Sequence, residues 1–463
     1  MTDVVDHYRD LLEQAFGGRR WILAMDVLAP MRGISAQLQR FGAEGCLCIA
    51  GSRGAGDSPD PDFAPDPIVL GVRGEDMMSA IRASLDALAT LSPEVCARVD
   101  AFDPNHEVRV IGTIFDDGRP VAGRDKYGAR PSSWQALEDK TRVDALWDRV
   151  GVERYPSRIV SVDDRGGLRE AARALDAGAG TVWTADSREG FHGGASFTRW
   201  VDGEASNAMR DFFAAHADRV RIMPFMEGIP CSIHGIVFPE QTIALRPCEM
   251  LVFRKPGTGA FHYGKCATFW DPPDADREQM RAIARRVGDR LRSDVGYRGA
   301  FTIDGVMTAD GFRPTELNPR YGAALGVMTS TVDLPMMLVN LMVVEGEPFD
   351  WRSAEVEETI LRVADAHRAG ATSAIVGVRV DDEVHETLAW DGRGYRRASE
   401  EDADARLLLG PSASGSYLSI RFAPQSVPVG ASVAPRAAAA LRWADEAFDL
   451  GIGELVPARE VRR

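Results

Sequence analysis

The segment FTIDGVMTADGFRPTELNPR, residues 301–320, decides the fold of this chain. Two stretches rich in apolar residues, 301–307 and 312–317, flank the tripeptide Ala309-Asp310-Gly311. An Asp-Gly pair between two apolar runs is a strong signal for a tight turn that joins antiparallel strands. The segment therefore predicts a β-hairpin.

Polar side chains gather on one face of this predicted hairpin. Glu316 and Asn318 are two residues apart on one strand, so they project to the same side. Asp304 comes alongside them if the two strands pair around the turn. Three hard oxygen donors on one face suit Mg²⁺ or Mn²⁺. Arg320, two residues further on, carries a planar guanidinium whose paired N–H groups suit a phosphate or a carboxylate. The alternative is a hairpin whose polar residues simply face solvent.

Composition limits the class of protein. The 463 residues suffice for two or three domains, and 45% hydrophobic with 27% charged residues excludes wholesale disorder. Lys and Arg number 54 against 69 Asp and Glu, a net charge of −15 that repels nucleic acid and anionic lipid. The longest aliphatic stretch, 335–344, is about half of what a bilayer crossing needs, and acidic residues interrupt any signal peptide. We expect a cytoplasmic protein that binds neither nucleic acid nor membranes.

The cysteines and histidines do not form metal or disulfide patterns. Six cysteines are too few for a disulfide framework in so long a chain, and no C-x-x-C occurs. None of the eight histidines stands four residues from another. A metal would therefore have to be held by carboxylate oxygens, which again favours Mg²⁺ or Mn²⁺.

The predicted domains are 1–130, 131–350 and 351–463. The first begins with a strand, a helix and a strand at 21–25, 31–41 and 46–50, an order typical of an open parallel sheet. The glycine-rich loop 51–56 could cradle a phosphate. However, the Pro- and Asp-rich segment that follows it cannot open a helix, so a surface loop is the better interpretation.

Further elements are expected along the remaining chain. Ser132 with Gln135 resembles a capping box that opens a helix, and 137–150 has a helical apolar face. The other expected elements are two strands within 182–200, a helix at 207–216, strands at 220–225, 232–238 and 242–253, and a helix at 437–448.

Asp304, the run Glu316-Leu317-Asn318-Pro319-Arg320 and the upstream pair Asp139-Lys140 resemble the ATP-grasp superfamily of carboxylate–amine ligases. The resemblance spans about residues 130–350. It implies an α/β chain with the ATP-grasp fold, an N-terminal open-sheet pre-ATP-grasp domain and a small C-terminal α/β domain. It also implies that ATP binds with Mg²⁺ or Mn²⁺, that Asp304, Glu316 and Asn318 bind the metal, and that Lys140 touches the α-phosphate.

The resemblance assigns a loop to the phosphates. The segment 187–196 is glycine-rich and lies between two strands, and glycine lets backbone N–H groups approach phosphates closely. The predicted contacts within it are Ser187, Arg188, Gly193, Gly194 and Ser196. A long hairpin turn is the alternative.

The resemblance also assigns a hinge that reads adenine, Met223-Pro224-Phe225-Met226-Glu227. The carbonyl of Pro224 can accept from the adenine amino group while the N–H of Met226 donates to the ring. Phe225 and Met226 could equally be ordinary core residues.

Two departures from the superfamily pattern stand out. Many members carry a second Lys before the glycine loop, where this chain has Ala185-Asp186, and an acid for the ribose near residue 230, where this chain has Pro230. The missing cation could be replaced by Arg188, Arg254, Lys255 or Lys265, of which Arg188 and Lys265 are predicted nucleotide contacts. Glu227, Ser232 or His234 could serve the ribose.

The narrower resemblance is to the peptide ligases of pheganomycin-type natural-product pathways. It implies an ADP-forming reaction in which ATP activates a carboxylic acid as an acylphosphate and an amine or peptide displaces the phosphate, with Arg320 and Arg298 as catalytic side chains. The expected partners are these small-molecule substrates and a second copy in a homodimer. The alternatives are a biotin-carboxylase-like or phosphotransferase enzyme on the same fold, and a nucleotide-binding regulator without turnover.

Overall fold

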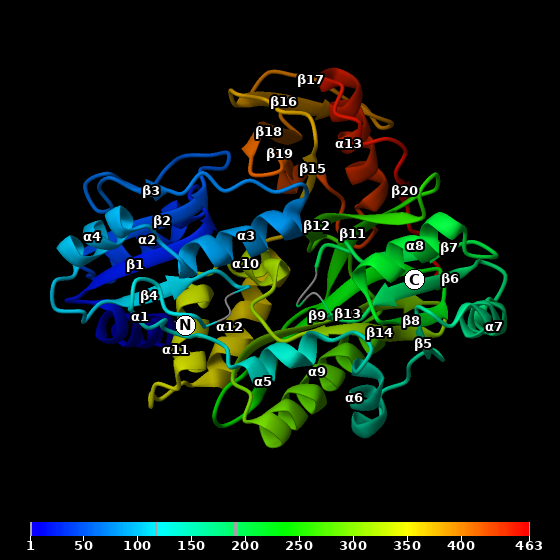
Figure 1. The fold of residues 1–463 in the computed structure, drawn as a ribbon, viewed down its shortest axis with the longest axis horizontal. Coiled ribbons are helices and arrows are strands. Elements are labelled where there is room, and N and C mark those ends of the chain that lie inside the picture. The colour runs from blue at the N-terminus through cyan, green and yellow to red at the C-terminus, as the bar shows by residue number, and fades with distance from the viewer. Residues whose placement is uncertain (1, 116–117, 189, 191–192, 463) are drawn as a thin grey trace.

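The computed structural model describes residues 2–115, 118–188, 190 and 193–462, and it contains three sheets (Figure 1). The first sheet has the order β3-β2-β1-β4 and all its pairs are parallel. Its strands are β1 (Arg20–Val27), β2 (Gly45–Ser52), β3 (Ile68–Val69) and β4 (Arg109–Gly112), and its helices are α1 (Thr2–Phe16), α2 (Met31–Arg40), α3 (Met77–Ala89) and α4 (Pro93–Phe102).

The central strands of this sheet are buried on both faces. In β1 the side chains of Trp21 and Leu23 enter one apolar core, and those of Ile22 and Ala24 enter another. Strands of this kind read as continuous apolar runs, which is why the sequence predicted them correctly. The glycine-rich segment 51–56 leads into irregular chain instead of a helix, as expected. Its first two residues end β2, and Gly51, Ser52 and Gly54 are buried, so it is only partly a surface loop.

The second sheet has eleven strands and two lobes. Its main path is β14-β13-β9-β11-β12-β7-β6-β8-β5, with β10 beside β9 and β20 beside β11. The first lobe contains β5 (Arg158–Ser161), α7 (Arg165–Leu175), β6 (Thr181–Ala185), β7 (Thr198–Val201), α8 (Asn207–His216) and β8 (Arg219–Pro224). The second contains β9 (Ile229–Val237), β10 (Thr242–Ala244), β11 (Cys248–Lys255), β12 (Ala260–Ala267), α9 (Asp274–Val295), β13 (Gly299–Thr308) and β14 (Gly311–Asn318).

Each lobe has its own core, and the chain crosses between them once as a hinge. Trp183 and Ile222 of the first lobe pack with Leu168 of α7 and Phe213 of α8. Ile303 of the second lobe packs with residues of α9. The segment between β8 and β9, residues 225–228, joins the two lobes.

The region before the first lobe differs from the sequence prediction. Ser132 opens the short helix α5 (Ser132–Gln135) as its first residue and makes no capping bond. A 3-10 helix (Ala136–Glu138) follows, and α6 covers only Val143–Val150, so the predicted helix over 137–150 is wrong in its first half. The Asp139 carboxylate accepts from the N–H and hydroxyl of Thr141, and such a local bond competes with the helix.

The aliphatic stretch near residue 340 lies inside the molecule. It forms α11 (Met336–Glu345), which follows α10 (Ala323–Thr329) and precedes α12 (Ser353–Ala366). All three helices contribute to the same core as the first sheet. Within the described ranges, no helix is both long enough and apolar enough to cross a membrane.

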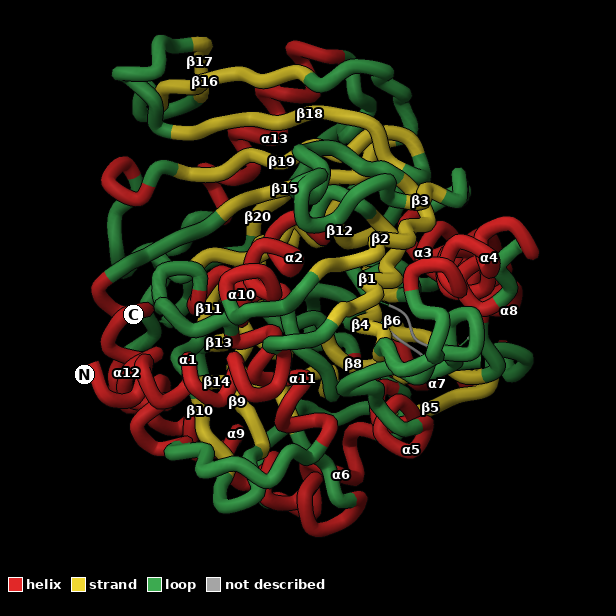
Figure 2. The backbone as a smooth tube through the Cα atoms, turned by 90° about the vertical axis from the view of Figure 1, so that its left-hand side faces the viewer, coloured by secondary structure: helices red, strands yellow, loops and turns green. Residues whose placement is uncertain are grey.

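The third sheet is antiparallel and has the order β15-β19-β18-β16-β17, with its strands stacked one above another in Figure 2. They are β15 (Ala371–Val376), β16 (Val384–Trp390), β17 (Tyr395–Arg397), β18 (Ala405–Ser412) and β19 (Gly415–Phe422). A 3-10 helix (Pro424–Ser426) and α13 (Ala434–Phe448) follow, and α13 packs on this sheet as the Ala-rich sequence predicts. The chain then returns to the second sheet through β20 (Val456–Pro457).

A buried carboxylate joins the second sheet to α13. Glu249 on β11 accepts from the backbone N–H groups of Val433 and Ala434 at the start of the helix, at 2.7 and 3.3 Å, and from the Ser432 hydroxyl. Burial raises the pKa of Glu249 from 4.5 to about 7. The folded protein therefore keeps a proton that the unfolded chain releases.

This shift predicts a pH-dependent stability. Between pH 4.5 and pH 7, the free energy of unfolding of the wild type should fall relative to that of Glu249→Gln by about 3 kcal/mol, because the unfolded state loses its proton first. Urea unfolding of both proteins from pH 4.5 to 8 measures the difference. A constant difference would mean that the pKa of Glu249 is the same in the folded and the unfolded protein.

Candidate active site

The predicted hairpin forms, and it brings the three predicted metal ligands together. Asp304 pairs with Glu316, and Thr302 pairs with Asn318. The side-chain amide of Asn318 donates to Asp304 at 2.8 Å and to Glu316 at 3.0 Å, and the Ser232 hydroxyl of β9 donates to Asp304 at 2.6 Å. We call Asp304, Glu316 and Asn318 the hairpin cluster.

The cluster has the electrostatics of a cation site. Burial and the adjacent Glu316 carboxylate raise the pKa of Asp304 to about 7. Two carboxylates this close repel each other unless a positive charge lies between or beside them. No group of three or more His, Cys, Asp and Glu in the described chain could hold a metal, but this cluster offers two carboxylates, whose hard oxygen donors fit Mg²⁺ or Mn²⁺. The amide oxygen of Asn318 would join them only after its side-chain amide turns, since the NH2 group faces both carboxylates and the oxygen accepts from Arg320.

Lys140 supplies a positive charge to the cluster. Its ammonium lies 2.7 Å from Glu316, and its side chain is only 6% exposed. The turn made by Asp139 and Thr141 places Lys140 between the 3-10 helix and α6. Lys140 and the hairpin cluster, far apart in the sequence, therefore share one site as predicted.

Arg320 contacts both the cluster and a buried carboxylate. Its guanidinium donates to the amide oxygen of Asn318 at 3.0 Å, and its Nε lies 3.6 Å from Glu138. Arg130 bonds the same Glu138 at 2.8 Å and the carbonyl of Pro319 at 2.9 Å. The guanidinium of Arg320 also lies over the ring of Phe115, 4.9 Å from its centroid. Glu138 thus positions Arg320, while one edge of the fork reaches the cluster.

The predicted glycine loop passes beside Arg320. A Cβ built on Gly193 would lie 3.7 Å from the Arg320 guanidinium, and one on Gly194, whose φ is +60°, would lie 2.9 Å from Met77 of α3. The Ser196 hydroxyl donates to the Gly193 carbonyl at 2.9 Å, and the Ser187 hydroxyl oxygen is buried with no hydrogen-bond partner among the described residues. Positions 189, 191 and 192 of the predicted loop lie outside the described residues.

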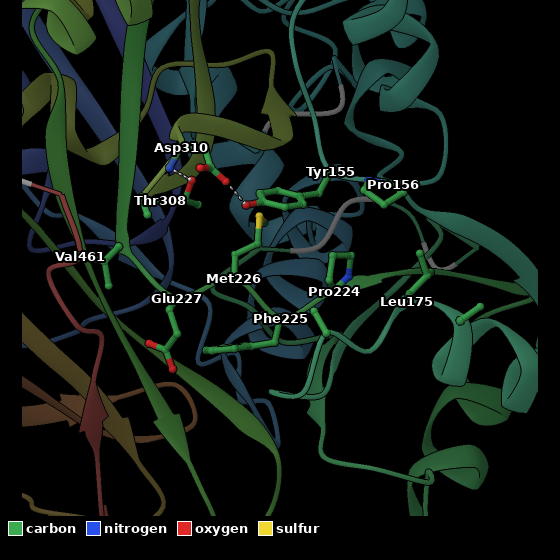
Figure 3. A pocket seen from close by; sticks show the side chains of 13 residues that line it. Tyr155, Pro156, Leu175, Pro224, Phe225, Met226, Glu227, Thr308, Asp310 and Val461 are labelled. Carbon is green, nitrogen blue, oxygen red and sulfur yellow. Dashed lines mark hydrogen bonds between the residues drawn. The ribbon is translucent and has the colours of Figure 1, made fainter.

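The hinge borders a cavity. About 530 Å³ is enclosed by the hinge residues Pro224 to Glu227 together with Tyr155, Pro156, Ala174, Leu175, Ala177, Thr308, Ala309, Asp310 and Val461. In Figure 3 the Tyr155 hydroxyl points to Asp310, to which it donates at 3.3 Å, and Met226 lies below them. The hairpin cluster does not line this cavity. Thr308 is four residues along β13 from Asp304, so the two places are about 13 Å apart.

Four candidate cations lie elsewhere. Lys265 donates to Ser419 of the third sheet at 3.1 Å. Arg188 donates to Ala217 at the end of α8, at 3.1 Å, and Arg254 lies over the rings of Trp200 and Phe225. Arg298 lies against Gly346. It directly precedes β13, six residues before Asp304, and so lies about 20 Å from that residue. The structure does not bring these residues to the hairpin cluster.

Two arginines of β8 were missed by the sequence analysis. Arg221, 1% exposed, forms a two-point ion pair with Asp144 and donates to the Thr315 carbonyl at 3.0 Å, so it ties the first lobe to β14. Arg219 lies 3.8 Å from Asp186 and 3.5 Å from the Thr141 hydroxyl, beside Lys140. The alternation Arg219-Val220-Arg221 in an apolar strand was the signal, since it puts two cations on one face.

The ribose candidates lie in different places. Glu227 lines the hinge cavity, and Ser232 bonds Asp304. His234 faces Thr302 across the strands, and burial lowers its pKa to about 3, so it is neutral.

Solved structures share this fold, whereas no protein-family model and no curated protein match the sequence. Pyruvate carboxylase of Rhizobium etli has a TM-score of 0.56 and 16% identity over 88% of this chain, which spans 36% of that enzyme. The biotin carboxylase domain of Hydrogenobacter thermophilus 2-oxoglutarate carboxylase has a TM-score of 0.54 and 13% sequence identity. The match covers 88% of this chain and 86% of that domain. Biotin carboxylase of Campylobacter jejuni has a TM-score of 0.50 and 12% sequence identity, and the match covers 89% of each chain. These are ATP-grasp structures, and the predicted α/β ATP-grasp fold is confirmed.

Proposed function

We propose that this protein is an ATP-dependent, ADP-forming ligase that activates a carboxylic acid as an acylphosphate and joins it to an amine. The observation that carries the proposal is the hairpin cluster with Lys140 and Arg320 at its edge, on one face of an ATP-grasp fold. A nucleotide-binding regulator would not need two carboxylates held so close at this cost in repulsion.

Each residue has a distinct task under this proposal. Asp304, Glu316 and Asn318 would hold Mg²⁺ or Mn²⁺, which when bound neutralises phosphate charge. Lys140 orients the nucleotide phosphates, and Arg320, fixed by Glu138, binds the transferred phosphoryl group or the acid with its planar fork. Arg219 stands on the same side and offers the positive charge that Ala185-Asp186 lacks.

The nucleotide would extend from the cluster to the hinge. The base would meet the Pro224 carbonyl and the Met226 N–H at the cavity in Figure 3, about 13 Å along β13 from Asp304. The glycine loop would cover the phosphates from the side of Gly193. Closure of such a loop excludes water, which protects an acylphosphate from hydrolysis.

The finer assignments are also proposals. We propose amide or peptide bond formation in natural-product biosynthesis, with a likeness to the pheganomycin-type ligases, domains at 1–130, 131–350 and 351–463, a cytoplasmic location and a homodimer. The likeness to the pheganomycin-type ligases rests on the sequence at 186–194 and 224–235.

The test is ADP release with a panel of acids and amines, with product masses as the second measurement. ADP that requires both an acid and an amine, with an amide product, supports the ligase. Bicarbonate and biotin belong in the panel because three similar structures are carboxylases or their domains. ADP formed only with those two would favour a biotin-carboxylase-like reaction, and binding of ATP without ADP in any mixture would favour a regulator.

Replacing Lys140 by Ala should raise the KM for ATP more than the KM for the acid. The ammonium is buried beside Glu316, so its loss should cost roughly tenfold to a hundredfold in ATP affinity through a charge-assisted contact. Steady-state kinetics with each substrate varied in turn measures this. Lys265→Ala is the matched variant, since its ammonium faces Ser419, and it should leave the KM for ATP near the wild-type value. If Lys265→Ala raised the KM for ATP and Lys140→Ala did not, Lys265 would be the side chain that contacts the nucleotide.

Replacing Gly193 by Val should lower kcat by at least about tenfold and change ATP affinity little. The added methyl groups would meet the Arg320 guanidinium, which a Cβ alone already approaches to 3.7 Å, and would hold the loop open. Gly257→Val is the control, because a Cβ there meets nothing within 4 Å. Equal effects on kcat and ATP affinity would show that the loop only binds.

A further inference from the structure

Residues 456–462 run back from the third sheet to the hinge between the two lobes, and we call them the strap. The strap begins as β20, which pairs with Phe253 and Arg254 of β11. The guanidinium of Arg254 lies over the ring of Phe225 in the hinge, 4.8 Å from its centroid. The strap is therefore attached beside the hinge, although it follows α13, which packs on the third sheet.

Arg462 attaches the strap at a second place, through three hydrogen bonds. Its guanidinium makes a two-point pair with the Asp276 carboxylate, at 2.6 and 3.0 Å, and donates to the Ala309 carbonyl at 2.7 Å. Asp276 lies in the first turn of α9, and its side chain is only 4% exposed. Ala309 belongs to the turn between β13 and β14. Arg462 therefore holds the strap against the turn of the hairpin whose strands carry the hairpin cluster.

Val461, next to this attachment, forms part of the wall of the hinge cavity. In Figure 3 its side chain lies near Thr308 and Glu227, on the opposite side from Leu175. Val461 is 40% exposed. An apolar side chain in the wall of a cavity of about 530 Å³ gains free energy when a flat apolar group, such as a nucleotide base, covers it.

We propose that the strap is part of the nucleotide site. Val461 packs against the base bound in the hinge cavity, and Arg462 is a positioning residue that holds Val461 and the hairpin turn in place. The inference rests on the proposed function, which puts the base at the hinge, and adds that a segment following the third sheet completes the base site. If the strap only tied the third sheet to the second, its substitutions would change stability and leave nucleotide affinity unchanged.

The role of Val461 is tested by binding of ADP with Mg²⁺ to the full chain, measured by calorimetry. Val461→Trp should lower ADP affinity at least about tenfold, because the larger side chain takes the space of the base. Val461→Ala should lower it about threefold to tenfold, because two methyl groups leave the contact. Val429→Trp is the matched control and should leave ADP affinity unchanged, since Val429 is 56% exposed and does not line the cavity.

The role of Arg462 is tested by a double-mutant cycle with Asp276. Arg462→Gln and Asp276→Asn should each lower ADP affinity roughly threefold or more. The double variant should lose no more than the larger of the two single losses, because both residues act through one ion pair. The melting temperature of each variant is measured beside its ADP affinity, since a purely structural strap would lower the first and not the second.

The outcomes separate this inference from the proposed function. ADP affinity that is the same in the wild type, Val461→Trp and Arg462→Gln would overturn the inference, as would an equal loss in Val429→Trp. ADP release with an acid and an amine would then leave the ligase proposal standing. A loss in Val461→Trp without one in Arg462→Gln would overturn the positioning role of Arg462.

Two further results concern the nucleotide itself. ADP affinity that depends on Val461, with no ADP released from any mixture of acid, amine and ATP, would support the strap and contradict the ligase. A wild-type protein that binds neither ADP nor ATP would contradict both the inference and the proposed function.

Discussion

Replacing Glu316 by Ala should lower ADP release by at least about 1000-fold while the protein stays folded. Glu316 is the residue that the other groups of the site share. It accepts from Asn318 at 3.0 Å, pairs with Lys140 at 2.7 Å and stands opposite Asp304 across the hairpin. Without it, the proposed metal loses a ligand and Lys140 loses the carboxylate that holds it.

The measurement is ADP formed per enzyme at several Mg²⁺ concentrations, with the melting temperature of each protein. Glu358→Ala is the control, because this glutamate is exposed on α12, outside the site, and its loss should leave both quantities near the wild type. Partial recovery of Glu316→Ala at high Mg²⁺ would support a metal role. ADP release unchanged in this variant would remove the hairpin cluster from the mechanism.

Replacing Arg320 by Lys should abolish the reaction although the charge is kept. One edge of the Arg320 fork bonds Asn318 and the other faces Glu138, and an ammonium cannot hold two such directions at once. We expect a loss of roughly 100-fold or more in kcat with the complete substrate mixture. Without the amine, the slow ADP leak expected of the wild type should also disappear.

The competing role for Arg320 is a structural ion pair with Glu138. In that case Arg320→Lys would keep the pair and would retain both the full and the partial reaction. Arg298→Lys is the comparison, since Arg298 precedes β13, lies about 20 Å from Asp304 and should tolerate the change. Full activity in Arg320→Lys, or a larger loss in Arg298→Lys, would transfer the catalytic role away from Arg320.

The hairpin cluster could be predicted because its geometry is local. An Asp-Gly turn fixes which residues of β13 and β14 pair, and alternation along a strand fixes which side chains share a face. The parallel strands of the first sheet could also be predicted from local sequence, since burial on both faces produces a continuous run of apolar residues. The helix predicted over 137–150 failed where a side chain, Asp139, bonded its own backbone turn and ended the helical pattern.

The sequence by itself therefore determined the hairpin with Asp304, Glu316 and Asn318, and the fold class that follows from it. Only the tertiary structure decided which cations reach that hairpin. Lys140 reaches the hairpin through Glu316, and Arg320 reaches it while its Nε lies beside Glu138. Lys265 instead bonds Ser419 of the third sheet. The physical reason is that long flexible side chains take the partner nearest to them after the lobes have packed, and the positions of those lobes depend on contacts between residues far apart in the chain.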